Sequence, residues 1–388
     1  MKNQELVSYI RNRKLRRGIQ IKFWRSRWRS GVMRGIERLM SGSNVSDRLA
    51  GNGIQLAHIP LLKTKIIAHE IYSRPRVLKD LEVKVQENRR ITISAVKGPV
   101  YKIILREGIV SLRDGSVWFE DGFILDDVLP HWQQLLYAGG LTDSLKNMSR
   151  VELKLPGDWT FLPKSNYFYH QFTENLPKAL KSLKDKPEIG VIAPFDTTPS
   201  LKELLAALPN KIFYCHESII QVEKLHTVTS ARIFTSEDGE LLRQFAFNAV
   251  PNIDLGQNLE KIYVVRGNLD RGDEKLESRL MERLSNCGFR TIQTESMSIS
   301  DQIKTFARAE IIISFHGGAL TNCIWMPKGN HVLEIFNHPF RTYDFARLAT
   351  EMELNYVPVE LSDTKASTNE KVELVINEYF KICNQSKD

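Results

Sequence analysis

Hydrophobic and polar positions follow two alternating patterns in the second half of the chain. Short apolar runs rich in β-branched residues have the length of buried strands, at residues 261–265, 289–293, 311–315, 331–336 and 354–359. Between these runs apolar residues recur every three or four positions, which predicts helices at about residues 273–286, 299–309, 341–351 and 369–382. Strands and helices in alternation predict a parallel sheet with helices on both faces.

The first half begins with a β-rich portion and then alternates in the same way. Strands are expected at residues 81–85, 91–96, 100–105 and 117–125. Asp114-Gly115 is typical of a hairpin turn between two of them. A helix, a strand, a helix and a strand are then expected at about residues 168–184, 189–193, 199–207 and 211–215. Pro251 and Gly256 indicate a hinge at about residues 250–259.

The predicted fold class is therefore α/β, with two domains in a chain of 388 residues. Residues 1–45 form a basic arm, and residues 46–252 an N-terminal domain that includes the β-rich portion. Residues 253–365 form a C-terminal domain. Residues 366–388 form a last helix, for which one arrangement is a crossing back onto the N-terminal domain.

The positive charge of the chain is concentrated in its first 40 residues. They hold 12 Lys or Arg and two acids, a net charge of +10, whereas the whole chain carries +8. Trp24, Trp28, Val32 and Ile36 recur every four residues among arginines, which predicts a basic amphipathic helix. Three interpretations stay open: a helix packed on its own domain, a helix on an anionic membrane surface, and a nucleic-acid arm. The third lacks a companion binding motif, so we expect no nucleic-acid partner.

Composition favours a cytoplasmic protein. Charged residues make up 26% of the chain, and no apolar run approaches the 18 residues or more of a membrane span. The N-terminus lacks the apolar core of a signal peptide. The four cysteines are widely spaced and match no metal pattern, so we expect free thiols in a reducing compartment.

The most informative segment is a strand that ends in a glycine turn. The apolar run 311–315 stops at His316-Gly317-Gly318, and Ala319 begins a helix. Such a turn directs backbone N–H groups and the positive end of a helix dipole at one point, which suits a diphosphate. A tight packing turn is the alternative.

The amino-acid sequence of this segment resembles the C-terminal signature of glycosyltransferase family 61. The usual form is His-Gly-Ala-Gly-Leu-Thr-Asn, followed by a hydrophobic stretch, Pro-x-Gly and a strand that bears Glu. The matching residues are His316, Gly317, Leu320, Thr321, Asn322, Pro327, Gly329 and Glu334, while Gly318-Ala319 reverses the family's Ala-Gly. The resemblance extends from about residue 160 to 360 through Tyr167 to Pro177, Arg266, Arg271 and Glu274, and the segment that begins at Ser298.

This resemblance implies two Rossmann-like domains of the GT-B type and an inverting transfer from a nucleoside-diphosphate sugar, with UDP as the expected donor class. It implies no metal and no cofactor, and the chain contains no Asp-x-Asp metal motif. The negative charge that develops on the leaving diphosphate must then be stabilised by arginine and a helix N-terminus. The nucleotide-sugar site is expected to consist of Arg266, Arg271, His316, Gly317, Gly318, Ala319, Asn322 and Glu334. The arginines, Glu334 and Asn322 each have a structural alternative. The arginines would form surface ion pairs, Glu334 would form a structural ion pair or a cap, and Asn322 would only hold the turn together by hydrogen bonds.

His170 and Glu174 are the candidate catalytic residues on the acceptor side. Four positions apart on a helix, they share one face, with Lys178 one turn further. An inverting transferase needs a base near the acceptor hydroxyl, and histidine has a suitable pKa. An exposed helix face, or a structural contact with the other domain, is the alternative. Pro177 is expected to kink or start the helix.

The sequence thus predicts a hexosyl- or N-acetylhexosaminyltransferase that acts on a polysaccharide or lipid-linked glycan acceptor in capsular or other surface polysaccharide assembly. The basic arm suggests a peripheral position on the inner face of the membrane. Two alternatives remain: a non-catalytic assembly scaffold with the same fold, and a dinucleotide-dependent oxidoreductase. The latter requires a Gly-x-Gly-x-x-Gly motif after a first strand, which is missing.

Overall fold

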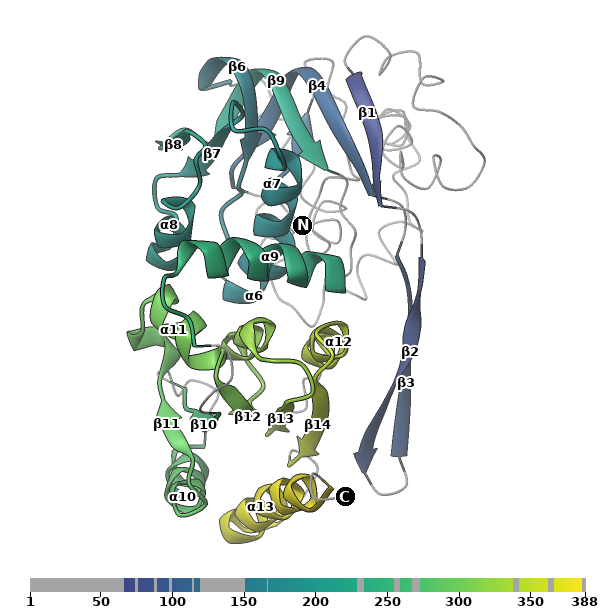
Figure 1. The fold of residues 1–388 in the computed structure, drawn as a ribbon, viewed down its shortest axis with the longest axis vertical. Helices are drawn as coiled ribbons and strands as arrows, with labels where there is room; N and C mark the ends of the chain where they lie inside the picture. Colours follow the sequence, from purple (N-terminus) through teal and green to yellow (C-terminus); the bar gives the residue numbers. More distant parts are fainter. Residues whose placement is uncertain are drawn as a thin grey trace, which may run out of the picture.

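The computed structural model describes twelve stretches of the chain (Figure 1), namely residues 66–73, 76–86, 89–97, 100–113, 115–118, 151–165, 167–228, 234–254, 259–266, 273–337, 342–361 and 366–385. The predicted basic arm and the candidate Arg271 lie outside these residues, as do residues 255–258 of the predicted hinge and most of the strand at 117–125. The described residues form an upper and a lower half in Figure 1, each built on one main sheet.

The C-terminal half is a five-stranded parallel sheet, as predicted. Its strands are β10 (Glu260–Val264), β11 (Arg290–Ile292), β12 (Ala309–Phe315), β13 (His331–Phe336) and β14 (Asn355–Glu360). The spatial order is β11-β10-β12-β13-β14, with every neighbour parallel. The chain therefore leaves β10 in one direction and returns to its other side at β12. In open parallel sheets, ligands bind at the carboxyl ends of the two strands that flank such a switch point.

Helices cover this sheet, and their ends follow local sequence signals. They are α10 (Glu274–Ser285), α11 (Ile299–Phe306), α12 (Asp344–Glu351) and α13 (Thr368–Gln385), with short 3₁₀ segments η4 (Thr294–Ser296) and η5 (Gly318–Trp325). Ser298 caps α11 by accepting a hydrogen bond from the Asp301 N–H at 3.0 Å, as its position predicts. The helix expected after the glycine turn is present, and it is of the 3₁₀ type.

The last helix does not cross back to the N-terminal domain. The apolar side of α13 packs beside α10 and the C-terminal sheet, where Val375 and Ile376 are buried with Tyr263 and Leu333. The crossing suggested from the sequence is thus wrong for residues 368–385. Their apolar stripe is buried within the domain that precedes them.

The N-terminal half has a mixed sheet with seven strands among the described residues. They are β1 (Ile66–Ser73), β4 (Val100–Ser111), β5 (Val117–Trp118), β6 (Leu153–Phe161), β7 (Gly190–Pro194), β8 (Ile212–Cys215) and β9 (Ile219–Val228). The pairs β6–β9, β6–β7 and β7–β8 are parallel, whereas β4 pairs antiparallel with β1, β5 and β9. The α/β class is confirmed. Two Rossmann-like domains in a GT-B arrangement stay a prediction.

A separate hairpin connects the two halves at their edge. Strands β2 (Arg76–Gln86) and β3 (Arg89–Lys97) pair with each other and run alongside the C-terminal half in Figure 1. β2 contacts β14 and α12. The hairpin of β2 and β3 thus lies beside β14 and α12, which follow it by more than 240 residues in the sequence.

The predicted helix at 168–184 contains a change of helical register. It consists of α6 (Phe168–His170), a π-helical turn η3 (Gln171–Asn175) and α7 (Leu176–Leu183). Pro177 has no N–H and its ring crowds the carbonyl four residues earlier, at Thr173. The Leu176 N–H instead bonds the Gln171 carbonyl, five residues back. Pro177 therefore does not end the helix but widens it, and such π-turns are frequent at functional sites.

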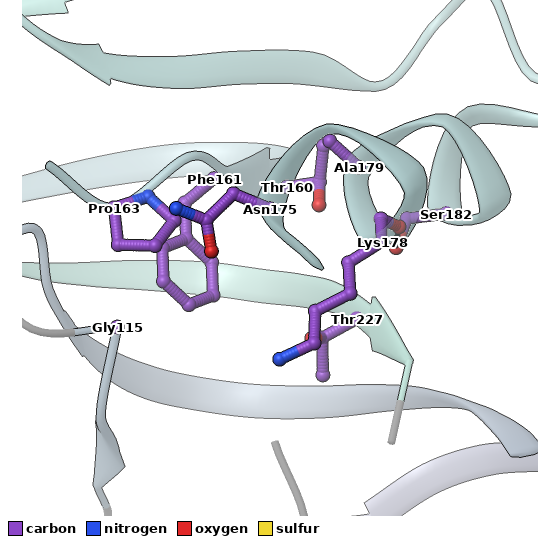
Figure 2. Close-up of a pocket in the computed structure, with 9 residues that line it drawn as sticks. All are labelled: Gly115, Thr160, Phe161, Pro163, Asn175, Lys178, Ala179, Ser182 and Thr227. Carbon is purple, nitrogen blue, oxygen red and sulfur yellow. Dashed lines mark hydrogen bonds between the residues drawn. The ribbon is translucent and has the colours of Figure 1, made fainter. Parts of the chain in front are cut away.

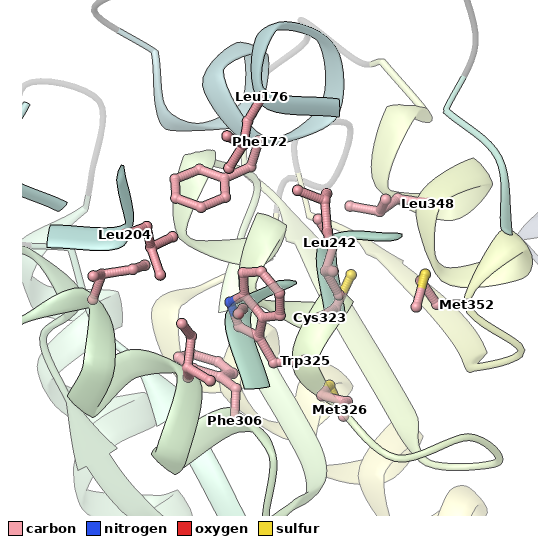
Figure 3. Close-up of a cluster of buried hydrophobic side chains, with 14 of the residues drawn as sticks. Phe172, Leu176, Leu204, Leu242, Phe306, Cys323, Trp325, Met326, Leu348 and Met352 are labelled. Carbon is pink, nitrogen blue, oxygen red and sulfur yellow. The ribbon is translucent and has the colours of Figure 1, made fainter. Parts of the chain in front are cut away.

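One apolar core joins the two halves (Figure 3). Phe172 and Leu176 from the helix with the π-turn, and Leu242 from α9 (Ser236–Ala249), pack with Phe306 and Trp325 of the C-terminal half. α8 (Pro199–Leu205) contributes to the same core.

Polar contacts reinforce this junction. Arg243 of α9 donates to the carbonyl of Ile324 at 2.6 Å and to that of Met326, at the C-terminal end of η5. A cation at this end of a helix satisfies carbonyls that have no partner within the helix. Among the described residues, no helix combines the length and apolarity required to cross a membrane.

Candidate functional site

The candidate site is built around the switch point of the parallel sheet. Arg266 follows β10, and His316-Gly317 follows β12, so both lie at the carboxyl ends of neighbouring strands. The Arg266 guanidinium lies over Gly317, because a methyl group placed on Gly317 would come within 3.1 Å of Nη2. Gly317 has extended backbone angles that any residue adopts. Glycine at this position lets the guanidinium lie close to the backbone, and a larger residue would displace it by a few tenths of an ångström.

Glu277 on α10 holds the backbone of Arg266 in place. Its Oε1 accepts a hydrogen bond from the Arg266 N–H at 3.0 Å. Burial raises the pKa of Glu277, and this hydrogen bond and the positive charge of Arg266 oppose that rise. The arginine thus emerges from the strand at a defined point.

His316 is positioned by a buried carboxylate. Its Nδ1 lies 2.5 Å from Oε1 of Glu334 on β13, and Oε2 of Glu334 accepts a hydrogen bond from the Tyr356 hydroxyl on β14. The Glu334 side chain is 0% exposed, and burial raises its pKa while the bonds to His316 and Tyr356 lower it. Glu334 was expected in the nucleotide-sugar site, with a structural ion pair or cap as the alternative. With both oxygens engaged and no exposed surface, its contact with a ligand would run through His316.

Asn322 holds the turn after the glycines together. Its Nδ2 donates to Gln302 Oε1 at 2.9 Å and to the Ala319 carbonyl at 3.1 Å, while its Oδ1 accepts from Trp325 Nε1 at 3.0 Å. The side chain is completely buried. Of the two roles considered for Asn322, the structure favours the structural one.

His170 and Glu174 form a second histidine–carboxylate pair. Their Nδ1 and Oε1 atoms are 2.7 Å apart, across the junction of α6 and the π-turn. The Glu174 side chain is 17% exposed, and its Oε2 is buried without a hydrogen-bond partner. The predicted adjacency on one helix face is thus present in the structure.

Aromatic rings connect this helix with the glycine turn. Phe345 on α12 lies between Tyr169 and His316, with ring centroids 5.3 Å and 5.6 Å away, both edge to face. A methyl group on Gly318 would lie 3.8 Å from Cβ of Phe168. The helix that carries the candidate acceptor-side residues therefore lies against the candidate donor-side turn.

Sequence reasoning did not identify Tyr356, Glu277 or Phe345. Tyr356 has no local motif, because it reaches Glu334 through the pairing of β13 with β14. Glu277 had a weak signal as an acid beside the apolar stripe Leu276, Leu280 and Leu284. Within the part of the chain that the structure describes, no three His, Cys, Asp or Glu side chains come together as a metal site. The cysteines are free thiols, as predicted.

Comparisons with known proteins agree with the motif. Residues 168–333 match the family model described as Glycosyltransferase 61. A comparison with curated proteins gives no match.

Solved structures show only distant likeness. A flavo di-iron protein mutant from Thermotoga maritima has 15% identity and a TM-score of 0.22, over 56% of this chain and 55% of that one. A rubredoxin oxygen:oxidoreductase from Desulfovibrio gigas has 13% identity and a TM-score of 0.22, over 71% and 64%. The chain thus spans less than two thirds of either protein, and such scores carry no argument about fold or activity.

Proposed function

We propose that this chain is a glycosyltransferase of family 61 that transfers a sugar from a UDP-sugar to a hydroxyl of a glycan or glycolipid, with inversion and without a metal ion. The match of residues 168–333 to the family model supports this proposal. The observation that carries this proposal is the Arg266 guanidinium over Gly317, beside His316, at the switch point of the parallel sheet. A diphosphate is the ligand class that such a combination of arginine, glycine and helix start suits best.

On the donor side, Arg266 and His316 would stabilise the negative charge of the leaving diphosphate. Glu334 holds Nδ1 of His316, so that the opposite ring nitrogen, Nε2, is assigned to the phosphate oxygen. Donors fixed before the reaction stabilise developing charge without further reorganisation. Tyr356 and Glu334 act through His316 and do not touch the substrate.

On the acceptor side, His170 would serve as the general base. The acceptor oxygen attacks the anomeric carbon while the bond from that carbon to the diphosphate oxygen breaks, and His170 takes the hydroxyl proton. Glu174 orients the imidazole through Nδ1 and stabilises the imidazolium that forms. Attack from the side opposite the leaving group inverts the configuration. The expected biological setting is surface polysaccharide assembly.

Nucleotide binding tests this proposal. In calorimetric titrations with excess EDTA, UDP should bind and NAD should not. Arg266→Ala should weaken UDP binding by about tenfold to a hundredfold, the usual cost of a hydrogen bond to a charged group. Arg283→Ala is the matched control, since Arg283 lies on the surface of α10 in an ion pair with Glu373. Preferential NAD binding would support the oxidoreductase, and no nucleotide binding at all would support the scaffold.

We also propose that the basic arm brings the enzyme to an anionic membrane surface. The arm's net charge of +10 and its Trp24 and Trp28 support this placement. Attraction to anionic lipid amounts to about 1 kcal/mol per basic residue near the surface. The full chain should cosediment with phosphatidylserine vesicles, more weakly at high salt, and removal of residues 1–40 should abolish this. Equal sedimentation of both forms would make the arm a packing element.

A further inference from the structure

The pocket beside the helix with the π-turn cannot hold a sugar (Figure 2). It lies between α7 and the sheet of the N-terminal half, where Phe161 and Thr227 form part of its lining. Its interior has room for about one water molecule, whereas ligand pockets enclose roughly 300–1,000 Å³. An acceptor that reaches His170 is therefore expected to bind on an exposed surface of this helix.

Tyr167 presents an exposed aromatic ring beside His170. It is the residue immediately before α6 and is 57% exposed, the largest value among the large apolar side chains of the described residues. The centroids of the Tyr167 and His170 rings are 5.9 Å apart, and the ring planes lie at 85° to each other. A sugar ring that lies on Tyr167 is thus within reach of the proposed base.

The backbone that carries this ring is held in place by hydrogen bonds. The Ser165 hydroxyl accepts from the Tyr167 N–H and contacts the Tyr167 carbonyl, both at 3.2 Å. The same carbonyl accepts from the Gln171 N–H at 3.1 Å, and the Gln171 side chain donates to the Ser165 carbonyl at 2.7 Å. Ser165 and Gln171 are both buried. The ring therefore projects from a fixed point, which lowers the entropic cost of binding a ligand.

Aromatic contacts continue from Tyr167 to the donor-side turn. The His170 ring also contacts Tyr169, edge to face at 5.3 Å. Tyr169 contacts Phe345, and Phe345 contacts His316. Tyr167 is thus packed into the same row of rings as both candidate histidines, and this packing fixes its position relative to the site of transfer.

The position of Tyr167 restricts the chemistry of its ligand. The molecule that covers this ring must also offer a hydroxyl to His170. A sugar ring does both, because its C–H groups can lie against the negative face of an aromatic ring while its hydroxyls remain free to form hydrogen bonds. A lipid chain would cover Tyr167 without a hydroxyl for the base.

We propose that Tyr167 is the acceptor platform of the enzyme, and that its ring stacks on the sugar residue whose hydroxyl is deprotonated by His170. This proposal rests on the proposed function for the transfer step, whereas sugar binding to Tyr167 is measurable without a donor sugar. The acceptor is then recognised through a sugar ring and not through the lipid part of a glycolipid.

Saturation-transfer NMR on the full chain tests the binding. The probes are the methyl glycosides of glucose, galactose and N-acetylglucosamine, each with and without UDP. At least one glycoside should give a saturable signal. Glycerol and n-octanol, which carry hydroxyls but no sugar ring, should not compete with it.

Substitutions at Tyr167 assign this signal to its ring. Tyr167→Ala should weaken glycoside binding by about tenfold, the order expected for the loss of one aromatic contact. Tyr167→Phe keeps the ring and should bind like wild type. Phe380→Ala is the matched control, since Phe380 is 46% exposed on α13 of the C-terminal half.

Kinetic measurements separate acceptor binding from chemistry. With a UDP-sugar that supports transfer, Tyr167→Ala should raise the KM for the glycoside by about tenfold and leave kcat within about threefold of wild type. Hydrolysis of the UDP-sugar should be unchanged, because water as the acceptor does not stack on the ring. His170→Ala should instead lower kcat with little change in this KM.

Several results would overturn the proposal. No saturable glycoside signal in either condition, or equal binding by wild type and Tyr167→Ala, would mean that no sugar binds to this ring. Equal losses in Tyr167→Phe and Tyr167→Ala would assign the binding to the hydroxyl, equal losses in Phe380→Ala would make the effect unspecific, and competition by n-octanol would indicate an apolar chain as the ligand. Failure of UDP to bind in the same samples, with Tyr167-dependent sugar binding retained, would refute the donor proposal and not the sugar platform.

Discussion

Among the described residues, two histidine–carboxylate pairs belong to the candidate site, one from each half of the molecule, and they are built differently. His170 and Glu174 belong to one helical segment, and their pairing depends on local geometry alone. His316 follows β12 and Glu334 lies within β13, and Tyr356 on β14 holds the carboxylate. Glu334 is completely buried, whereas Glu174 is partly exposed.

This difference suits two tasks. A group that meets charge on a diphosphate works best when it is rigid and preorganised. A general base must be accessible to the acceptor hydroxyl, and a partly exposed carboxylate beside it can move with the histidine as different acceptors bind. The comparison therefore predicts that the pairs respond differently to the same substitution.

The largest expected effect is on turnover. His170→Ala should lower sugar transfer by roughly 10²–10⁴-fold, the usual contribution of a general base, while UDP affinity stays near that of wild type. His316→Ala should instead weaken UDP binding together with turnover. Radiolabelled sugar transfer and calorimetry measure the two quantities.

His226→Ala is the matched control for both variants. His226 forms a third pair with Asp158, at 2.7 Å, on β9 and β6 of the N-terminal sheet. If His170→Ala keeps its activity and Glu174→Ala loses it, the base is Glu174. If His316→Ala alone abolishes transfer at full UDP affinity, the roles of the two histidines are reversed.

The second effect is on stability. His316→Ala should lower the free energy of unfolding by about 3–5 kcal/mol, because it leaves a buried carboxylate without its main partner. His170→Ala should cost less, about 1–2 kcal/mol, because the Glu174 side chain is still 17% exposed and water can replace part of the lost hydrogen bond. Urea denaturation measures the free energy of unfolding of both variants. Equal losses of stability would contradict the proposed difference between the two histidine–carboxylate pairs.

The pH dependence of this loss has a defined sign. Burial raises the pKa of Glu334, and removal of His316 should raise it further. The native state then holds a proton that the unfolded chain releases, so stability falls as pH rises above the ordinary carboxyl pKa. The defect of His316→Ala should shrink at lower pH.

The most gradual effect, spread over several pH units, concerns Lys178, the neighbour of the partly exposed pair His170 and Glu174. The pKa of Lys178 is lowered from 10.5 to about 8, so between these values the unfolded chain binds a proton that the native state does not. Wild-type stability should therefore rise with pH relative to Lys178→Met, by at most about 1.4 kcal/mol per pH unit. Lys184→Met should follow wild type. Denaturation curves between pH 7 and 10.5 measure the slope, and a flat difference would refute the shift.

Sequence patterns predicted the C-terminal half well because each of its elements carries its own signal. The strand at 331–336 and the Ser298 cap are present as expected. β6 and α9 were not predicted, and each contains a residue that obscures the pattern. Gly157 lies at an irregularity in the pairing of β6 with β9, and Gly239 interrupts α9, where it packs closely on Met352.

The sequence identified residues that the fold gathers at the glycine turn, but not the contacts that position them. The glycine turn, Arg266 and both histidines have local motifs. The roles of Asn322 and Glu334 depend on Gln302, Trp325 and Tyr356, which the fold brings from other elements. Tertiary contacts of this kind leave no periodicity in the sequence.

The shared apolar core has a consequence for cooperativity. Because Phe172 of one half and Trp325 of the other are buried in the same cluster, neither half can unfold without exposing apolar surface of its partner. The two sheets should therefore melt in a single transition. A substrate that stabilises the N-terminal half would then also protect the backbone amides of β12 from exchange with solvent.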